Sequence, residues 1–422
     1  MDQAVLTLLI MVATAVMLLL ELIPPAATAF LCALSLTLSG ILTPQDAFKD
    51  FANINIILFG AMFVIGHAVF SVGIATDLGN LIKKYADNEK KLVLAILLVA
   101  GSLSAFLSNT STSAIFLPLI IGLAAGSGYS KSKLLYTMMV AVGMGGSITF
   151  LGGPGWLFAK AQIEASKPGT LVSMFEIAKV TLPLFIISVI YMLIIGYKLI
   201  PNRQSDEEQE FKEEKATEIP AWHKKFVAVI TLLTVLGMLF SAQININAAI
   251  IAVIGALALV LSGVIKENEA YRVISWKTLF LFGGILPLST ALEQTGAGEM
   301  IANFVLKIMG GTTNPFIITA VCMIVPCVLS QFLSNTTCMA IFTPLGISIA
   351  HKIGADPTAV IMAISIGACL AITTPIGQPG NAMIYGPSGL KFADYAKPGV
   401  PLTAILLVVS IFLIPIVWPF FG

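Results

Sequence analysis

Two short stretches of this chain nearly repeat each other, and they constrain the fold more than any other feature of the sequence. The stretches at 103–119 and 329–345 agree at twelve of seventeen positions, at an offset of 226 residues. Each places a polar Ser-Asn-Thr group between two apolar runs of roughly 15 residues, and such a run is too short to cross a bilayer comfortably. Each stretch is therefore expected to form a re-entrant hairpin with a polar tip.

The polar tips predict a binding site inside the membrane. Backbone at that depth leaves the helix only where protein or a water-filled cavity satisfies its polar groups, and matching breaks in two halves of one chain are typical of transporters. The helix that restarts after each tip directs free N–H groups and the positive end of its dipole towards the break, which favours an anion. Side-chain and carbonyl oxygens there can ligate a small hard cation. The alternative interpretation of either copy alone is an ordinary capped turn.

The composition places the chain in a lipid bilayer. The 422 residues are 57% hydrophobic and only 11% charged, and the mean hydropathy is +0.96. These values are typical of a polytopic membrane protein. The formal net charge is +1, so no strongly basic face indicates nucleic acid as a partner. The five cysteines lie in apolar segments without metal-ligand spacing and are interpreted as small core residues.

The order of apolar segments predicts an all-α polytopic membrane protein built from two copies of one unit. Each copy contains five crossings and one re-entrant hairpin. Because five is odd and a hairpin returns to its own side, the second copy should be upside down relative to the first, which makes an inverted repeat. The predicted units are a first repeat over 1–200 with its hairpin at 91–126, a polar cytoplasmic linker over 201–224, and a second repeat over 225–422 with its hairpin at 316–350.

The basic residues predict how the chain is oriented in the membrane. If the linker is cytoplasmic, 17 of the 23 Lys and Arg residues fall on its side, as the positive-inside rule requires. We therefore predict a multi-pass protein of the cell membrane with both termini outside. The first hairpin then enters from the cytoplasm and the second from outside, so their tips can meet near the midplane.

A second pair of breaks is expected in the crossing that follows each hairpin. The segments at 145–156 and 372–381 carry Gly and Pro where an uninterrupted span would not. We interpret both as unwound helix middles whose freed carbonyls face a cavity or an ion, with simple proline kinks as the alternative.

Ionisable residues are rare in the predicted spans. None of the five candidates forms a chain of acids and histidines of the kind that marks a proton relay; these are Glu21, His67, Asp77, Glu164 and Glu293. His67 is interpreted as a hydrogen-bonded packing residue. A cation/proton antiporter, the alternative from another class, would need buried carboxylates beside the breaks. Because no buried Arg is available, an anion site must use neutral donors, and co-bound cations would offset the anion's charge.

Serine pairs lead into both tips. Ser104 precedes Ser108 by four residues and Ser330 precedes Ser334 by four, so each pair lies on one helix face. The pairs are natural cation ligands together with the adjoining carbonyls. The alternative is that each serine bonds back to its own i−4 carbonyl.

Several of these motifs together resemble the divalent anion:sodium symporter family of the INDY type. The resemblance rests on Glu21–Thr28, the two tips, the broken crossings and the closing segment Tyr385–Tyr395. It implies a homodimer of scaffold and transport domains that moves as an elevator, and tips that bind substrate carboxylates and two sodium ions. Family members carry dicarboxylates, citrate or sulfate. The family's Thr-Pro-Pro-Asn appears here as residues 153–156 (GPGW) and 378–381 (QPGN), which leaves the choice of substrate open.

The breaks and the resemblance together give a set of candidate site residues. Those expected to bind substrate are Ser108, Asn109, Thr110, Ser334, Asn335, Thr336, Thr373, Thr374, Gln378 and Pro379. Those expected to bind sodium are Ser104, Ser108, Asn109, Gly152, Ser330, Leu333, Asn335 and Gly377.

The sequence therefore predicts a secondary active transporter of a small divalent anion, a C4 dicarboxylate such as succinate or malate. Sodium is the expected coupling ion, and no other cofactor is expected. A sodium-independent dicarboxylate exchanger and a sulfate transporter of the same family remain alternatives. An enzyme is not expected, because the spans offer no nucleophile with a base and no metal-ligand motif such as His-Glu-x-x-His.

Overall fold

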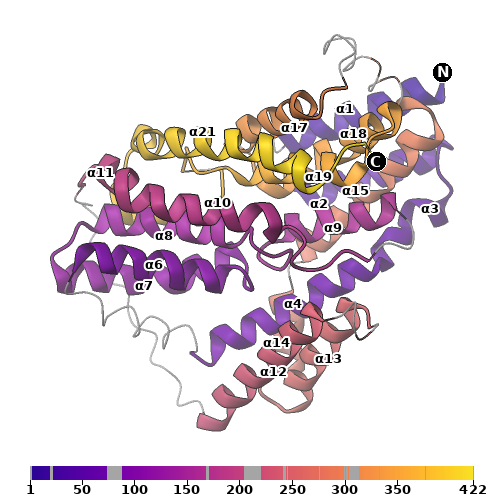
Figure 1. Cartoon of the computed structure of the whole chain (residues 1–422). Helices are drawn as coiled ribbons and strands as arrows, with labels where there is room; N and C mark the ends of the chain where they lie inside the picture. The colour runs from indigo at the N-terminus through magenta and orange to yellow at the C-terminus, as the bar shows by residue number, and fades with distance from the viewer. Residues whose placement is uncertain are drawn as a thin grey trace.

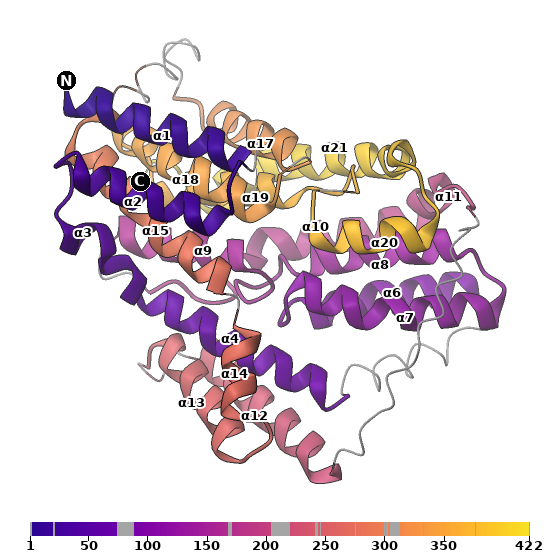
Figure 2. The same cartoon turned by 180° about the vertical axis from the view of Figure 1, so that it is seen from behind.

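The computed structural model is helical throughout the part of the chain that it describes. That part comprises residues 2–19, 22–73, 88–167, 171–203, 220–240, 244, 246–274, 276–298, 300, 303, 313–331, 333–375 and 377–421, and it contains no strand. Glu21, Asp77 and residues 204–219 of the predicted linker lie outside the described residues. Figures 1 and 2 show the helices from opposite sides, with both chain ends towards the same end of the molecule.

The helices follow the predicted segments closely in both halves. Those of the first half are α1 (Gln3–Leu19), α2 (Pro25–Leu38), α3 (Pro44–Phe48), the 3-10 helix η1 (Lys49–Ala52), α4 (Ile54–Ser71), α6 (Glu89–Ser104), α7 (Asn109–Ser127), α8 (Lys131–Gly145), α9 (Pro154–Ser166), α10 (Ala178–Tyr191), the π-helical turn η2 (Met192–Gly196) and α11 (Tyr197–Leu199). Those of the second half are α12 (Ala221–Leu239), α13 (Ala248–Leu261), α14 (Glu267–Val273), α15 (Trp276–Gln294), α17 (Pro315–Ser330), α18 (Asn335–Ile353), α19 (Pro357–Cys369), α20 (Pro379–Ser388) and α21 (Phe392–Val417).

Each predicted hairpin is a pair of helices with the same end chemistry. Asn88 caps α6 and Asn314 caps α17, each through its side-chain oxygen, which satisfies N–H groups that the first helical turn leaves free. The second helix of each pair ends at a glycine with a positive φ, +73° at Gly128 and +67° at Gly354, a backbone conformation that favours glycine. The duplication therefore includes the residues that begin and end the hairpin helices.

Both crossings that follow the hairpins are interrupted. The first breaks between the end of α8 at Gly145 and the start of α9 at Pro154, and the second between Cys369 of α19 and Pro379 of α20. Proline stands at the first position of α9 and α20, where its missing N–H costs nothing. The described residues of each break therefore form turns and bends followed by a new helix start, which a simple proline kink would not give.

The two halves pack by exchanging elements. Helix α2 packs against α15, and α4 packs against α13. The first three spans of one half therefore pack against the first three spans of the other half. In the same way α9 packs on α18 and α19, and α20 packs on α7 and α8. We call α6–α11 and α17–α21 the hairpin bundle, and α1–α4 with α12–α15 the peripheral helices. The predicted repeats are therefore units of sequence that intertwine in space (Figures 1 and 2).

Much of the outer surface is apolar. Leu9 is 53% exposed, Leu261 84% and Ile416 69%, and such contiguous apolar exposure suits lipid better than water. Among the described residues, three helical stretches are long and apolar enough to cross a membrane, namely 44–69, 178–199 and 392–417. Six shorter apolar helices of 10–17 residues accompany them.

Candidate transport site

The serine at each tip caps the helix that follows it. Ser108 Oγ accepts a hydrogen bond from the Ser111 amide at 3.2 Å and lies 2.8 Å from Ser111 Oγ. Ser334 Oγ repeats this geometry with Thr337, at 3.1 Å and 2.7 Å. The capped-turn interpretation therefore describes the two serine side chains correctly. Their roles in binding substrate or sodium stay predictions.

The asparagine that follows Ser108 lies in a cluster of oxygens. The inner end of the Asn109 side-chain amide is 2.9 Å from Ser104 Oγ and 3.2 Å from the carbonyl oxygens of Val142 and Gly152. Ser104 Oγ also donates to the Val142 carbonyl at 2.9 Å. We call these four residues the oxygen cluster. Three of them, Ser104, Asn109 and Gly152, are predicted sodium ligands that the fold brings together from α6, α7 and the break after α8.

The amide of Asn109 can present either end to the cluster. With nitrogen inward, it donates to the three oxygens around it. With oxygen inward, its nitrogen donates outward to Gln378 Oε1 at 3.3 Å, and its oxygen then lies 2.9 Å from Ser104 Oγ and 3.2 Å from each of the two carbonyl oxygens. Hard cations bind to such all-oxygen sets, and a bound cation offsets the repulsion between facing acceptors. The donor set therefore fits a small cation such as sodium.

Glycine is required at two positions around this cluster. A Cβ on Gly146 would lie 1.9 Å from Asn109 Oδ1, and one on Gly152 would lie 2.0 Å from the Gly146 carbonyl oxygen. Both distances are far below van der Waals contact, so the missing side chains let backbone and amide approach closely. The Val142 carbonyl was not predicted, because it is backbone in the last turn of α8, where it accepts from the Gly146 amide at 2.9 Å and from Ser104 Oγ at 2.9 Å.

The second tip has a related but different environment. Asn335 Nδ2 donates to Cys369 Sγ at 3.6 Å, while its Oδ1 is buried without a hydrogen-bond partner among the described residues. Ser330 Oγ donates back to the Cys327 carbonyl of its own helix at 3.0 Å, which is three residues back and not the four that the alternative interpretation gave. A Cβ on Gly377 would lie 2.8 Å from the Ser330 carbonyl oxygen. A buried amide oxygen such as Asn335 Oδ1 has the chemistry of a cation ligand, and Leu333 lies in the turn between α17 and α18.

Gln331 ties the second hairpin to the second break, a role that the sequence did not predict. Its Nε2 donates to the carbonyls of Cys327 and Leu370, at 2.9 and 3.0 Å. Its Oε1 accepts from the amide of Thr373 at 3.1 Å and from the Thr373 hydroxyl at 2.5 Å. Thr374 Oγ1 donates to the Gln331 carbonyl. The two threonines predicted to bind substrate therefore hold the break against the hairpin.

A chain of polar contacts joins the two tips. Gln378, the residue before α20, accepts from Asn109 and donates to the Cys369 carbonyl at 3.1 Å, and Cys369 Sγ meets Asn335. Gly155 of α9 lies beside Thr336 of the second tip, because a Cβ there would be 3.7 Å from the Thr336 Cα. The starts of α7 and α20 and those of α18 and α9 thus form two neighbouring pairs. Pro379 is the first residue of α20, and its side chain lies outside the described part of the structure.

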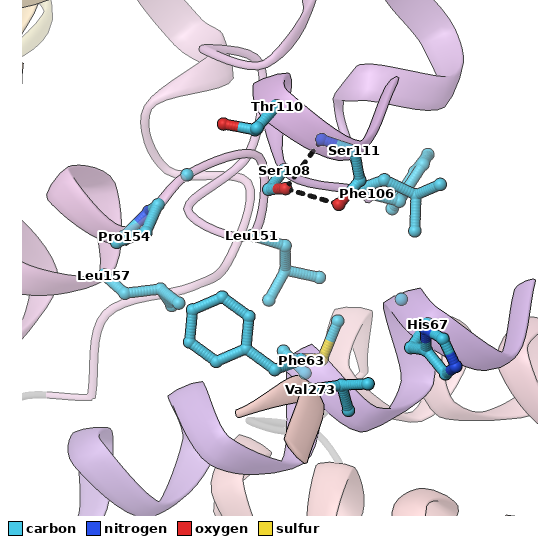
Figure 3. Close-up of a pocket in the computed structure, with 14 residues that line it drawn as sticks. Phe63, His67, Phe106, Ser108, Thr110, Ser111, Leu151, Pro154, Leu157 and Val273 are labelled. Atoms are coloured by element: carbon cyan, nitrogen blue, oxygen red, sulfur yellow. Dashed lines mark hydrogen bonds between the residues drawn. The ribbon is translucent and has the colours of Figure 1, made fainter. Parts of the chain in front are cut away.

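A cavity of about 310 Å³ opens beside the first tip. Its polar wall contains Ser108, Thr110 and Ser111, and the start of α9 borders it at Gly153 and Pro154 (Figure 3). The remaining lining is apolar except for one histidine; it consists of Met62, Phe63, Gly66, His67, Phe106, Leu107, Leu151, Leu157 and Val273.

Only part of the predicted substrate set lines this cavity. Ser108 and Thr110 do, and Asn109 lies directly behind them in the oxygen cluster. The predicted residues of the second half are not in its lining. The α4 wall was missed, because an apolar helix carries no sequence signal that it faces a tip.

Comparisons with known proteins fit this geometry. A family model described as "Citrate transporter" matches residues 15–325 and 299–421. An uncharacterized transporter of Synechocystis is 23% identical, with 99% of this chain and 97% of the relative covered. A sodium-dependent dicarboxylate transporter of Staphylococcus saprophyticus is 24% identical, with 98% and 87% covered.

A solved structure supports the fold as well. The crystal structure of the Alcanivorax borkumensis YdaH transporter superposes with a TM-score of 0.64 at 15% identity, and 99% of this chain and 98% of that chain are covered. The family and these relatives are membrane transporters and not enzymes, as the sequence predicted for this chain. The chain belongs to the citrate transporter family, and with it to the divalent anion:sodium symporters that its motifs resemble.

Proposed function

We propose that this protein is a sodium-coupled secondary transporter of a small organic dianion, a C4 dicarboxylate such as succinate or malate. The observation that carries the proposal is the oxygen cluster around Asn109. The inner end of the Asn109 amide lies there 2.9 Å from the Ser104 hydroxyl and 3.2 Å from each of two carbonyl oxygens. A cation in that cluster places positive charge directly behind Ser108 and Thr110.

The substrate side of the proposal rests on charge. The polar wall of the cavity offers hydroxyls and a helix start, and its lining contains no Lys or Arg. A dianion at this wall needs compensating charge, and sodium at the cluster supplies it, so the anion and the cation stabilise each other. This mutual stabilisation is the physical basis of coupling. A relative named as a sodium-dependent dicarboxylate transporter supports the assignment.

The apolar walls favour an organic anion over sulfate. Phe63, Leu151 and Leu157 face the hydroxyl wall (Figure 3). A dicarboxylate has a hydrocarbon centre that can contact these side chains, whereas sulfate is polar in every direction and would lose hydration without compensation. Sulfate and sodium-independent exchange are therefore the competing outcomes of the test below.

We further propose that the hairpin bundle moves against the peripheral helices as an elevator, in a homodimer. The breaks, the tips and the polar network belong to the hairpin bundle, while the peripheral helices pack among themselves through α2 with α15 and α4 with α13. The cavity at the first tip lies between these two groups of helices. Relative movement of the two groups would therefore change the access to that cavity.

Uptake into proteoliposomes tests the function. Radiolabelled succinate, malate and sulfate are supplied with an inward sodium gradient, with potassium in its place, or with unlabelled substrate preloaded inside. We expect sodium-driven accumulation of a C4 dicarboxylate, no accumulation with Asn109→Ala, and normal uptake with Asn247→Ala, which removes a helix-cap asparagine at the start of α13. Counterflow that persists without sodium identifies an exchanger, and uptake of sulfate alone refutes the dicarboxylate assignment.

A further inference from the structure

The cavity beside the first tip has one titratable side chain in its lining. His67 lies on α4, on the wall across from Ser108 and Ser111 (Figure 3). Its Nε2 is 2.8 Å from Oε1 of Glu269 on α14, and the two side chains are 26% and 42% exposed. The pair therefore places an imidazole and a carboxylate side by side at the wall of this cavity.

The other charges near α4 do not replace this pair. Neither α7 nor α13 carries a charged residue. On α14, Tyr271 donates to Glu267 at 3.0 Å, and on α9 Lys160 and Glu164 pair with each other at 2.5 Å. The remaining charged or titratable residues on elements that contact α4 are Arg272 of α14, Lys49 and Asp50 of η1, His223, Lys224 and Lys225 of α12, and Lys277 and Glu293 of α15.

The net charge of the pair depends on one proton. When the imidazole is neutral, Glu269 gives this wall a charge of −1, which repels an approaching anion. When the imidazole is protonated, the two charges cancel. At separations of about one Debye length, a unit charge changes the affinity for a dianion by roughly three- to tenfold. Protonation of His67 should therefore strengthen anion binding at this cavity by that factor.

We propose that His67 and Glu269 together set the affinity of this cavity for the dianion, which binds more tightly when His67 carries a proton. The inference rests on the proposed function, because it concerns the binding of a dianion at the first tip. His67 acts here through its charge and that of Glu269, and no contact with the substrate is required. It differs from the packing role that the sequence predicted, since a packing residue gives no dependence on pH.

The test measures malate binding to the purified protein in saturating sodium at about pH 6 and about pH 8, because histidine is the side chain whose charge changes in the physiological range. Malate stays almost fully ionised across this range. The wild type should bind malate roughly three- to tenfold more tightly at pH 6. His67→Gln leaves Glu269 uncompensated, so binding should be weak at both values. Glu269→Gln removes the repulsion, so binding should be tight at both values, and so should binding by the double variant.

Matched controls exist in the chain, which has three histidines. His223→Gln and His351→Gln should keep the wild-type dependence on pH. If His67→Gln keeps it too, or if Glu269→Gln binds malate no better at pH 8 than the wild type does, the inference is wrong while the proposed function stands. If no variant and no condition gives dicarboxylate binding or uptake, the proposed function fails and the inference fails with it.

Discussion

A single methyl group at Gly146 should disrupt sodium binding without removing any ligand. Gly146 closes α8 with a φ of −64° and a ψ of −8°, values that alanine adopts without strain. The added Cβ, however, would lie 1.9 Å from Asn109 Oδ1 and 3.0 Å from Ser104 Oγ. The Asn109 amide must therefore move by at least about 1 Å, which takes it out of reach of the carbonyl oxygens of Val142 and Gly152.

The size of the effect follows from the cost of overpacking. Forcing an extra carbon into a closely packed site costs roughly 1–3 kcal/mol. Because Asn109 is only partly buried, its side chain can turn away, so this cost falls on the cluster more than on the fold. At about 1.4 kcal/mol per tenfold, the sodium concentration for half-maximal malate binding should rise by roughly 5- to 100-fold in Gly146→Ala.

The assay is sodium-dependent malate binding to purified protein, with the melting temperature as a measure of folding. Gly122→Ala, on the hairpin helix α7 that packs against α8, is the matched control, because a Cβ there meets nothing within 4 Å. Asn109→Ala combined with Gly146→Ala should bind sodium no more weakly than Asn109→Ala alone, since both changes act on one amide. Wild-type sodium dependence in a well-folded Gly146→Ala protein would refute the cluster as a cation site.

Other changes test the remaining parts of the site. Gln331→Leu should lower the free energy of unfolding by roughly 2–4 kcal/mol, because it leaves buried carbonyls and amides unpaired, and thermal unfolding measures this. Asn335→Ala should abolish uptake while expression and oligomeric state stay normal, as size-exclusion chromatography would show. Burial raises the pKa of Asp356, but the hydrogen bond from Lys167 and that residue's charge outweigh burial and hold the pKa below its ordinary value. The stability from this pair is present above about pH 4 and lost as the pH falls further, so Asp356→Asn should reduce acid sensitivity in denaturation scans. A cysteine at Ser111, with the five native cysteines replaced, should react with an impermeant thiol reagent from one side only, and substrate should change the rate.

Sequence reasoning recovered the helical framework because hydrophobicity and end chemistry act locally. The hairpin helices begin and end within about three residues of the predicted bounds, and the breaks at Gly146 and Leu370 follow from glycine and proline. The short helices α3 and α14 were missed, because five and seven residues give too little periodicity to detect. Hydropathy also could not show that the halves exchange elements, since periodicity reports which face is apolar and not which helix covers it.

The candidate site was predictable where unusual residue types mark it in the sequence. Ser104, Asn109 and Gly152 could be named because the tip and the break carry unusual residue types. The Val142 carbonyl and the Gln331 side chain could not, since one is backbone in an ordinary helix and the other is a position where the two repeats differ, Ala105 against Gln331. A sequence repeat identifies residues that both halves share. It therefore does not identify a residue such as Gln331, which occurs in one half only.

The differences between the halves matter as much as their similarity. At an offset of 225 residues, Gly152 corresponds to Gly377 and Gly146 to Ala371, and a Cβ on Gly377 would indeed meet Ala371. The second half thus has a methyl group where the first keeps space for an amide. Asn335 accordingly contacts the Cys369 thiol, a soft donor that suits sodium poorly. The two halves therefore share part of their backbone geometry at the tips, while the side chains give the first tip the more complete set of oxygen donors for the cation that we propose.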